Sequence, residues 1–355
     1  MENRMKFLPA HKRTNRRTDI LLCGAFSILA LALTGCPANV EPAKDPLFTV
    51  PKGFPEPVFP ADNPVNADKI ELGRKLFYDS LLSSDKTVAC ASCHKQELAF
   101  TDGKEVSRGV NGELGNRNSP TIVNAAYASR LFWDGRSATI EEQALAAATN
   151  PAEMRAVEPV IDVRLQQDSA YAVEFAKAFG NGTKPTTRLA MKAIATFVRT
   201  VLSGSSRYDE FNNGNTGALN DSEKRGKDLF FSARTQCAEC HSGHNFTDDK
   251  FHSTGLFTHY FDKGRFDVTK TSADVGKFKT PSLRNIALTA PYEHDGHIPT
   301  LEAVIEHYNS GGKDFMNKDS RIHPLYLTDT EKKDIIAFLN SLTDNTLLQN
   351  KRFGK

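Results

Sequence analysis

Two short segments each combine two cysteines and a histidine at a spacing that suits covalent attachment of a haem. They are Cys90-Ala91-Ser92-Cys93-His94 and Cys237-Ala238-Glu239-Cys240-His241. Two thiols on one helical turn can add to the two vinyl groups of one haem, and the adjacent imidazole can then bind the iron. The sequence therefore predicts two c-type haems, with His94 and His241 as the proximal iron ligands.

Zinc binding and disulfide formation are the alternatives for these four cysteines. A zinc site with four thiolates would have to bring together two pairs that are far apart in the chain, and both pairs are followed by histidine. Disulfides are common in exported proteins but require no histidine. Haem attachment explains both the cysteines and the histidines.

The sequences around the two motifs are similar, which indicates an internal duplication. The matching pairs include 72–77 with 225–230, 100–102 with 246–248, 120–124 with 281–285, 133–135 with 294–296, and 139–141 with 300–302. A segment rich in Gly, Asn and Ser, residues 203–217, lies between the two halves. We therefore expect two related domains, each with one haem.

The regular elements that must position these residues are predicted to be helices. Apolar residues recur with a period near 3.6 over 68–82, 139–148, 164–178, 187–202, 221–231, 300–309 and 328–342. Thr139 with Glu142, and Thr328 with Glu331, have the spacing of capping boxes. No segment alternates strongly enough to predict a sheet. We predict a mostly α protein with two cytochrome-c-like domains, residues 61–210 and 211–345, followed by a tail, 346–355.

The composition excludes several classes of protein. The chain has 355 residues, 39% of them hydrophobic and 25% charged, which is typical of globular proteins and not of disordered chains. A formal net charge of +2 gives no electrostatic basis for binding nucleic acid.

The N-terminus indicates export. Residues 1–35 resemble a lipoprotein-type signal peptide: basic residues precede the apolar run Ile20–Leu33, and Leu33-Thr34-Gly35-Cys36 resembles a lipobox. Cys36 would then be acylated and become the new N-terminus; an ordinary cleaved signal peptide with an incidental Cys36 is the alternative. Residues 36–60 are predicted to be a linker or wrapping arm. We expect the mature protein on the periplasmic side of a bacterial membrane, lipid-anchored or soluble, where haem is attached covalently.

A resemblance to a known family rests on longer motifs. Phe132-Trp133-Asp134-Gly135-Arg136, then Gln143, then Asn150-Pro151-Ala152-Glu153-Met154 are similar to the bacterial di-haem cytochrome c peroxidase family, which includes MauG. The second half carries two further similar segments, 280–285 and 289–296. The resemblance covers about residues 53–345, nearly the whole mature chain.

The resemblance implies roles for individual residues. It implies a peroxidatic haem in the first domain and an electron-receiving haem in the second, with Trp133 between them. Gln143 and Glu153 match the distal-pocket pair of the peroxidatic haem, and a carboxylate with a raised pKa could move a proton between the two oxygens of peroxide. Asn118 and the carbonyls of Thr289 and Pro291 match a calcium site between the domains. A core aromatic is the alternative for Trp133, and a solvated loop residue is the alternative for Glu153.

Two departures from the usual pattern of the family affect the iron ligands. Many members place a distal histidine where this chain has Val110, which cannot bind iron, so we expect the first haem to have an open distal face. Many members also place a methionine where this chain has Tyr308, which is the position of a ligating tyrosine in MauG. Tyr308 is the predicted sixth ligand of the second haem; His307, Met316 or no residue are the alternatives.

Three functions compete at this point. The first is a peroxidase that reduces hydrogen peroxide with electrons from a small periplasmic cytochrome c or cupredoxin. The second is a MauG-like enzyme that oxidises residues of a partner protein, which Tyr308 and Val110 favour. The third is a di-haem electron carrier without catalysis, which would need both irons six-coordinate. Members of the family are often dimers, so a homodimer is a further expectation.

Overall fold

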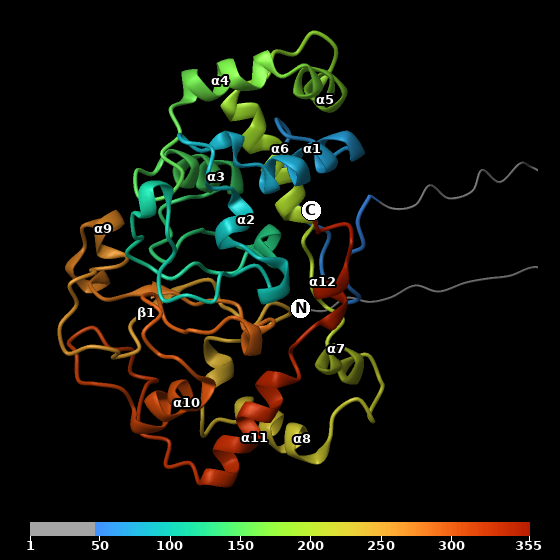
Figure 1. The fold of residues 1–355 in the computed structure, drawn as a ribbon. Coiled ribbons are helices and arrows are strands. Elements are labelled where there is room, and N and C mark those ends of the chain that lie inside the picture. Colours follow the sequence, from blue (N-terminus) through green and yellow to red (C-terminus); the bar gives the residue numbers. More distant parts are fainter. Residues whose placement is uncertain (1–46) are drawn as a thin grey trace, which may run out of the picture. The chain divides into compact units, whose positions relative to one another are not determined.

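The computed structural model describes residues 47–355 (Figure 1). The predicted signal peptide, Cys36 and the first part of the arm lie outside the described residues. The helices are α1 (Ala67–Tyr78), α2 (Cys90–Cys93), α3 (Ile140–Thr149), α4 (Glu158–Gln167), α5 (Ser169–Phe179), α6 (Thr187–Thr200), α7 (Arg207–Asn212), α8 (Asp221–Phe230), α9 (Phe266–Thr269), α10 (Leu301–Ser310), α11 (Asp329–Asn340) and α12 (Asn345–Gln349). Short 3-10 turns lie between them: η1 (Ser80–Leu82), η2 (Gln96–Leu98), η3 (Val110–Gly112), η4 (Ala125–Tyr127), η5 (Cys237–Glu239), η6 (Ser272–Asp274) and η7 (Ile286–Leu288).

The sheet content of residues 47–355 is minimal, as the lack of alternation predicted. Strands β1 (Phe251–His252) and β2 (Phe278–Lys279) pair antiparallel, with Phe251 opposite Lys279. Within the same residues, no helix is both long enough and apolar enough to cross a membrane.

Each half is organised around one tightly packed pair of helices. In the first half α1 packs on α6, and in the second half α8 packs on α11. Both contacts need a glycine: a Cβ on Gly73 would lie 2.0 Å from the carbonyl oxygen of Ala193, and one on Gly226 would lie 1.8 Å from that of Asp334. The two glycines occupy the same place in the repeat, so the packing confirms the internal duplication.

The helix predicted over 164–178 is wrong as a single element. The structure has two helices, α4 and α5, because Asp168 interrupts the chain between them. Its side chain accepts hydrogen bonds from the backbone N–H groups of Ala170 and Tyr171 and so caps the start of α5.

Of the two predicted capping boxes, one is complete in the structure and the other is not. Thr328 and Glu331 form a complete box at the start of α11. Thr139 accepts from the N–H of Glu142 as predicted, but the Glu142 carboxylate accepts from the N–H of Ala138 and not from that of Thr139. Threonine alone therefore provides the N-cap of α3.

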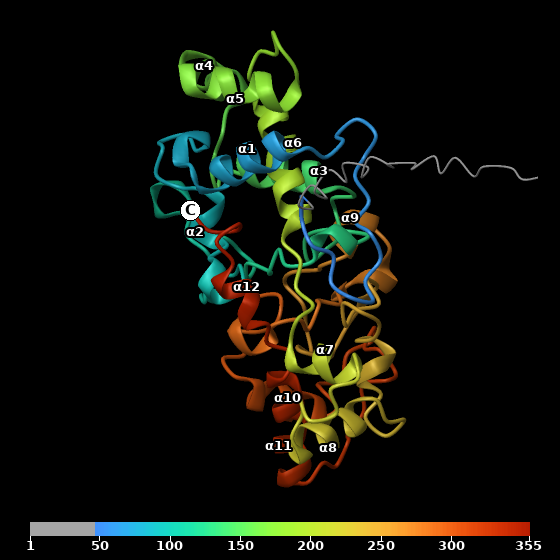
Figure 2. The same cartoon turned by 90° about the vertical axis from the view of Figure 1, so that its right-hand side faces the viewer.

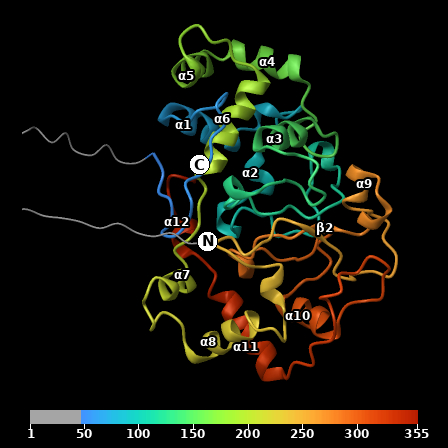
Figure 3. The same ribbon diagram turned by 180° about the vertical axis from the view of Figure 1, so that it is seen from behind.

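The buried apolar residues form two clusters, one in each half. The first contains residues of α1 and α3 to α6, and the second contains residues of α8, α10 and α11. Helices α4 and α5 lie at the end of the first half that is remote from α10 and α11, as opposite views show (Figures 1 and 3). The C-terminal tail leaves the second half, and its Leu347 and Phe353 join the first cluster. Figure 2 shows α12 and the C-terminus beside α2.

Candidate haem centres

Both motif histidines are oriented by the same hydrogen bond. His94 Nδ1 lies 2.9 Å from the carbonyl oxygen of Phe100, and His241 Nδ1 lies 3.0 Å from that of Phe246. Since a carbonyl can only accept, Nδ1 carries the proton in each ring and Nε2 keeps its lone pair. Burial lowers the pKa of both rings. Each histidine is therefore a neutral imidazole prepared to bind iron through Nε2.

The chemistry of the donors fits haem in both halves. The thiols of Cys90, Cys93, Cys237 and Cys240 are all free, and each pair lies on one short turn that ends at its histidine. In the second half Cys237, Cys240 and His241 line a cavity of about 280 Å³ whose wall is largely apolar. A mostly apolar cavity with two thiols and one imidazole at its edge is the environment that a c-type haem requires.

Tyr308 lies in this second cavity, and the two other candidate ligands lie elsewhere. Tyr308 lines the wall together with both cysteines, and burial raises its pKa well above the ordinary value. His307 donates from Nε2 to the carbonyl oxygen of Thr254 at 3.1 Å, and Met316 is 89% exposed. Of the three side chains, only Tyr308 lines the cavity that also contains Cys237, Cys240 and His241, so Tyr308 is the one that could reach a haem bound there.

Helices α3 and α10 are equivalent elements of the two halves, and they carry different residues at equivalent positions. Each begins after a threonine N-cap, Thr139 or Thr300. Counting from these caps, Gln143 corresponds to Val304 and Ala147 corresponds to Tyr308. Val304 and Tyr308 both line the second cavity. By the equivalence of the two helices, we expect Gln143 and Ala147 on the face of α3 that turns to the first haem. A methyl group thus stands in the first half where a phenol stands in the second.

Ala147 is a candidate site residue that the sequence analysis did not name. The signal was present in the repeat, because the comparison of the halves that gave Trp133 and His294 extends along the helix to this pair. Alanine has no ligand atom and little bulk, which is consistent with the expected open face of the first haem.

Glu153 lies in the first half close to the haem-attachment cysteines. Its charge contributes to raising the pKa of both Cys90 and Cys93. Burial raises the pKa of Glu153 itself, while the hydrogen bond from Asn150 Nδ2 to its Oε1, at 2.7 Å, and the charge of Arg136 oppose the shift. The structure thus provides a carboxyl whose proton is held more tightly than that of an ordinary glutamate.

A close approach of two loops fixes the position of Glu153. The N–H of Val110 donates to the carbonyl oxygen of Glu153 at 2.8 Å. A Cβ on Gly109 would lie 2.4 Å from that same oxygen, so only glycine allows this contact. Val110, the residue at the place of the absent distal histidine, is buried in the core of the first half.

Trp133 lies where the two halves meet. It lines the cavity of the second haem from the side of the first half. Its Nε1 donates to the carbonyl oxygen of Asn118 at 2.9 Å, and the N–H of Asn118 donates to the carbonyl oxygen of His294 at 2.8 Å. Arg117 reinforces the junction through ion pairs with Asp134 of the first half and Asp262 of the second.

The three predicted calcium ligands gather around the same cavity. Asn118, Thr289 and Pro291 all line its wall. The Nδ2 of Asn118 donates to the carbonyl oxygen of Lys104 at 2.8 Å, which leaves Oδ1 as the atom of this amide that could bind a cation. The structure thus provides oxygen atoms from both halves in the wall of this cavity, and the calcium ion itself stays a prediction.

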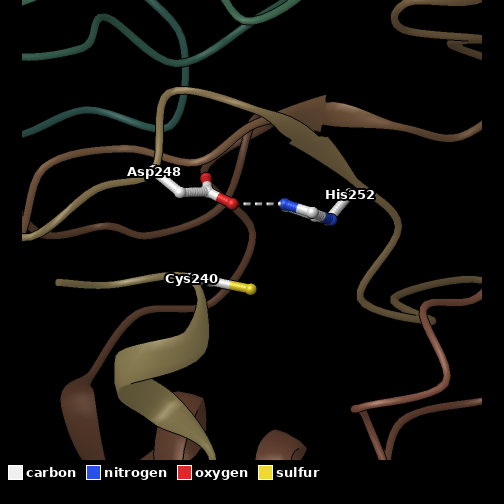
Figure 4. Close-up of side chains that lie close together, drawn as sticks. All are labelled: Cys240, Asp248 and His252. Carbon is white, nitrogen blue, oxygen red and sulfur yellow. Dashed lines mark hydrogen bonds and ion pairs between the residues drawn. The ribbon is translucent and has the colours of Figure 1, made fainter. Parts of the chain in front are cut away.

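A cluster of Cys240, Asp248 and His252 resembles a small metal site but belongs to the second haem (Figure 4). Its potential ligand atoms lie within 4.8 Å of one another, and the Asp248 carboxylate is 2.9 Å from His252 Nε2. The sulfur of Cys240 is one of the two haem-attachment atoms. The second nitrogen of His252 faces Asp319 at 2.8 Å, so both ring nitrogens already have protein partners.

Comparisons with known proteins agree with this geometry. A family model described as di-haem cytochrome c peroxidase matches residues 67–217, and one described as cytochrome c matches residues 223–343. The cytochrome-c peroxidase IdrP1 of Pseudomonas sp. (strain SCT) is 37% identical, with 93% of each chain covered. The methylamine utilization protein MauG of Methylorubrum extorquens is 34% identical, with 91% of this chain and 92% of that protein covered.

A solved protein structure matches the fold of this chain over almost the whole length of the solved protein. It is the crystal structure of a MauG-like protein associated with microbial copper homeostasis, with a TM-score of 0.83, 38% identity, and coverage of 86% of this chain and 97% of that one. With two haem-attachment turns, two oriented histidines and relatives of this similarity along nearly its whole length, the chain belongs to the di-haem cytochrome c peroxidase family.

Proposed function

We propose that this protein is a di-haem peroxidase that reduces hydrogen peroxide to water at the haem held by Cys90, Cys93 and His94. The observation that carries the proposal is Glu153, a half-buried carboxyl near Cys90 and Cys93 with a raised pKa. The relatives named cytochrome-c peroxidase support the same reaction class. The stoichiometry is one peroxide, two electrons and two protons to two waters.

The roles of the chain's own residues follow from their placement. Cys90 and Cys93 would hold the first haem, and His94 would bind its iron; the bound haem supplies the site where the oxygen–oxygen bond is cleaved. Glu153 accepts the proton of the inner peroxide oxygen and returns it to the outer oxygen, which leaves as water. Gln143, on the face of α3 toward this site, donates a hydrogen bond that orients the peroxide.

Electrons enter through the second half in this proposal. Cys237, Cys240 and His241 would hold the second haem, and a small cytochrome c or cupredoxin would be the donor. Trp133 lies in the wall between this cavity and the first half and is the relay. Its hydrogen bond to Asn118 fixes the indole at the junction.

The test is peroxide-dependent oxidation of a reduced small cytochrome c by the mature holoprotein, with Glu153→Gln and Glu113→Gln in parallel. Glu113 is an exposed glutamate of the neighbouring loop. Turnover by the wild type and by Glu113→Gln, with a large loss in Glu153→Gln, would support the proposal. Equal turnover in all three proteins would exclude Glu153 as the proton-transfer residue.

A MauG-like oxidation of a partner protein is the second candidate, and Tyr308 favours it. The side chain lines the second cavity, and its predicted position is that of the ligating tyrosine in MauG. Replacement by phenylalanine separates the two functions. If Tyr308→Phe keeps full peroxidase turnover, the phenol is not needed for that reaction. If it abolishes accumulation of oxidising equivalents in the absence of a donor, the MauG-like function gains support.

The remaining expectations are also proposals. We propose a calcium ion held by Asn118, Thr289 and Pro291, which chelation should remove with a loss of turnover. We also propose a lipid anchor at Cys36 on the periplasmic side of the membrane, on the support of Leu33-Thr34-Gly35-Cys36. The mass of the mature N-terminal peptide, in the wild type and in Cys36→Ser, tests the anchor.

A further inference from the structure

The two ends of the described chain pack crosswise, each against the histidine loop of the half to which it does not belong. We propose that these ends are positioning segments for the proximal iron ligands. The arm, residues 47–60, holds the loop of His241 in the second half. The tail, residues 346–355, holds the loop of His94 in the first half. The proposal rests on the two haems and not on the peroxidase activity.

The arm reaches the second half through Phe54. Its ring lies 4.8 Å from the ring of His244 and 4.9 Å from the guanidinium carbon of Arg284. The same guanidinium carbon lies 5.4 Å from the ring of Phe246. The Nε and Nη2 atoms of Arg284 donate to the carbonyl oxygen of His244 at 2.9 and 2.6 Å. Phe54 thus closes a packed unit that contains the whole turn from His241 to Phe246.

The surroundings of Phe54 are adapted to this contact. A Cβ on Gly204 would lie 2.3 Å from Pro51 and 2.9 Å from the Phe54 ring, so the glycine provides the space for the arm. Tyr127 Oη donates to the carbonyl oxygen of Pro55 at 2.9 Å. The Nε2 of His244 is buried without a hydrogen-bond partner among residues 47–355, so this ring is held by aromatic packing.

The tail makes the corresponding contact with the first half. Gln96, two residues after His94, donates from Nε2 to the carbonyl oxygens of Leu347 and Asn350 at 2.8 and 2.9 Å. The Phe353 ring lies 6.5 Å from the Phe100 ring. The carbonyl oxygen of Phe353 accepts a hydrogen bond from Tyr78 Oη at 2.7 Å. The red tail beside α2 in Figure 2 shows this crossing from the second half to the first.

Phe100 and Phe246 need such support because of their backbone. Both carry the carbonyl that accepts from a histidine Nδ1, and both have a left-handed φ, 61° and 51°. A side chain other than glycine keeps this conformation only where its surroundings enforce it. Loss of the packing would relax the turn and lengthen the hydrogen bond to the histidine. The imidazole would then be a weaker donor to ferric iron, and the reduction potential of that haem would rise.

The test is spectroelectrochemical titration of the holoprotein, in which each haem gives its own reduction wave. We expect Phe54→Ala to move one wave to higher potential and Phe353→Ala to move the other wave in the same direction. Phe54→Tyr keeps the ring and should restore the wild-type titration. Phe48→Ala is the matched control, because Phe48 packs on Phe59 within the arm and has no contact with the His244 ring.

The reduction potentials of the two haems test the proposal independently of peroxidase turnover. If both variants move the same wave, or if neither wave moves, the crosswise assignment is overturned. A shift in Phe48→Ala equal to that in Phe54→Ala would likewise overturn it, since the effect would then be general to the arm. If Phe54→Ala yields no holoprotein, Phe54→Leu replaces it with the same expectation. Shifted waves in a protein without peroxidase activity would reject the proposed function and keep this inference.

Discussion

The indole Nε1 of Trp133 donates a hydrogen bond to the backbone carbonyl of Asn118 at 2.9 Å, and Asn118 is itself bonded to the second half through His294. The single tryptophan of the chain is therefore connected by two hydrogen bonds to the backbone beyond the domain junction. A buried indole N–H finds an acceptor in a core residue as well as in a relay, so these bonds fix the position of the ring at the junction. The relay stays a prediction.

Trp133→Phe is expected to slow electron transfer and leave haem binding intact. Phenylalanine fills most of the same space but is much harder to oxidise and cannot bond to Asn118. We expect turnover with a cytochrome donor to fall about tenfold or more, a rise in the barrier of at least about 1.4 kcal/mol. Stopped-flow kinetics would measure it, with absorption spectra of both haems as the control. Unchanged kinetics would mean that electrons bypass the indole.

The pH dependence of turnover is expected to follow the raised pKa of Glu153. Burial favours the neutral carboxyl, so the carboxylate that must accept a proton disappears at a higher pH than for a glutamate with the ordinary value of 4.5. We expect kcat/KM for peroxide to fall on the acid side, with its midpoint above that value. Glu153→Gln should lose about 10²-fold to 10⁴-fold in rate together with this acid limb. An acid limb that persists in Glu153→Gln would belong to another group.

The two equivalent glycines are expected to be equally intolerant of a side chain. Gly73→Ala and Gly226→Ala each place a methyl group within about 2 Å of a backbone carbonyl, and backbone cannot move as a flexible side chain can. We expect each to lower the free energy of unfolding by about 1–3 kcal/mol or more. Thermal unfolding of holoprotein would show it. Gly217→Ala, whose Cβ would meet nothing closer than 3.6 Å, should remain near the wild type.

The fold and the haem motifs could be predicted from the sequence because local patterns carry them. The CxxCH turns, the threonine caps of α3 and α10 and the period of the helices need only residues close together in the chain. The break at Asp168 was missed because the apolar period continues through it, and only the capping hydrogen bonds show that the helix restarts. The crosswise packing of arm and tail joins residues far apart in the chain, such as Tyr78 and Phe353, which are 275 positions apart, and no local pattern contains such a contact.

The residues of the candidate site also differ in whether a local sequence pattern could predict them. Glu153 and Gln143 were identified through a motif, and the pairing of Ala147 with Tyr308 follows from counting along α3 and α10 from their threonine caps. The close approach of Gly109 to Glu153 depends on how two loops fold over each other. Tyr308 and His307 are adjacent on α10, so their side chains point in directions about 100° apart around the helix axis. Tyr308 therefore lines the cavity and His307 does not.

Glu293, a carboxyl in the wall of the second cavity, is expected to make stability depend on pH. Burial raises its pKa to about 7, with a further contribution from Asp295. The pKa of Glu293 in the folded state lies above the value of about 4.3 for an unfolded glutamate, so the folded state binds the proton more tightly. The stability that this difference contributes is fully present below the unfolded pKa of about 4.3. It is lost as the pH rises through about 7, where a charge must be buried.

Replacement by glutamine removes this charge at every pH. We therefore expect the melting temperature of Glu293→Gln to exceed that of the wild-type holoprotein by a margin that widens from pH 6 to pH 8, on either side of the pKa of about 7. Glu302→Gln, in the exposed first turn of α10, should show no such trend. A margin that stayed constant or narrowed over this interval would show that the carboxylate has a partner when haem is bound, and that the cavity compensates its charge.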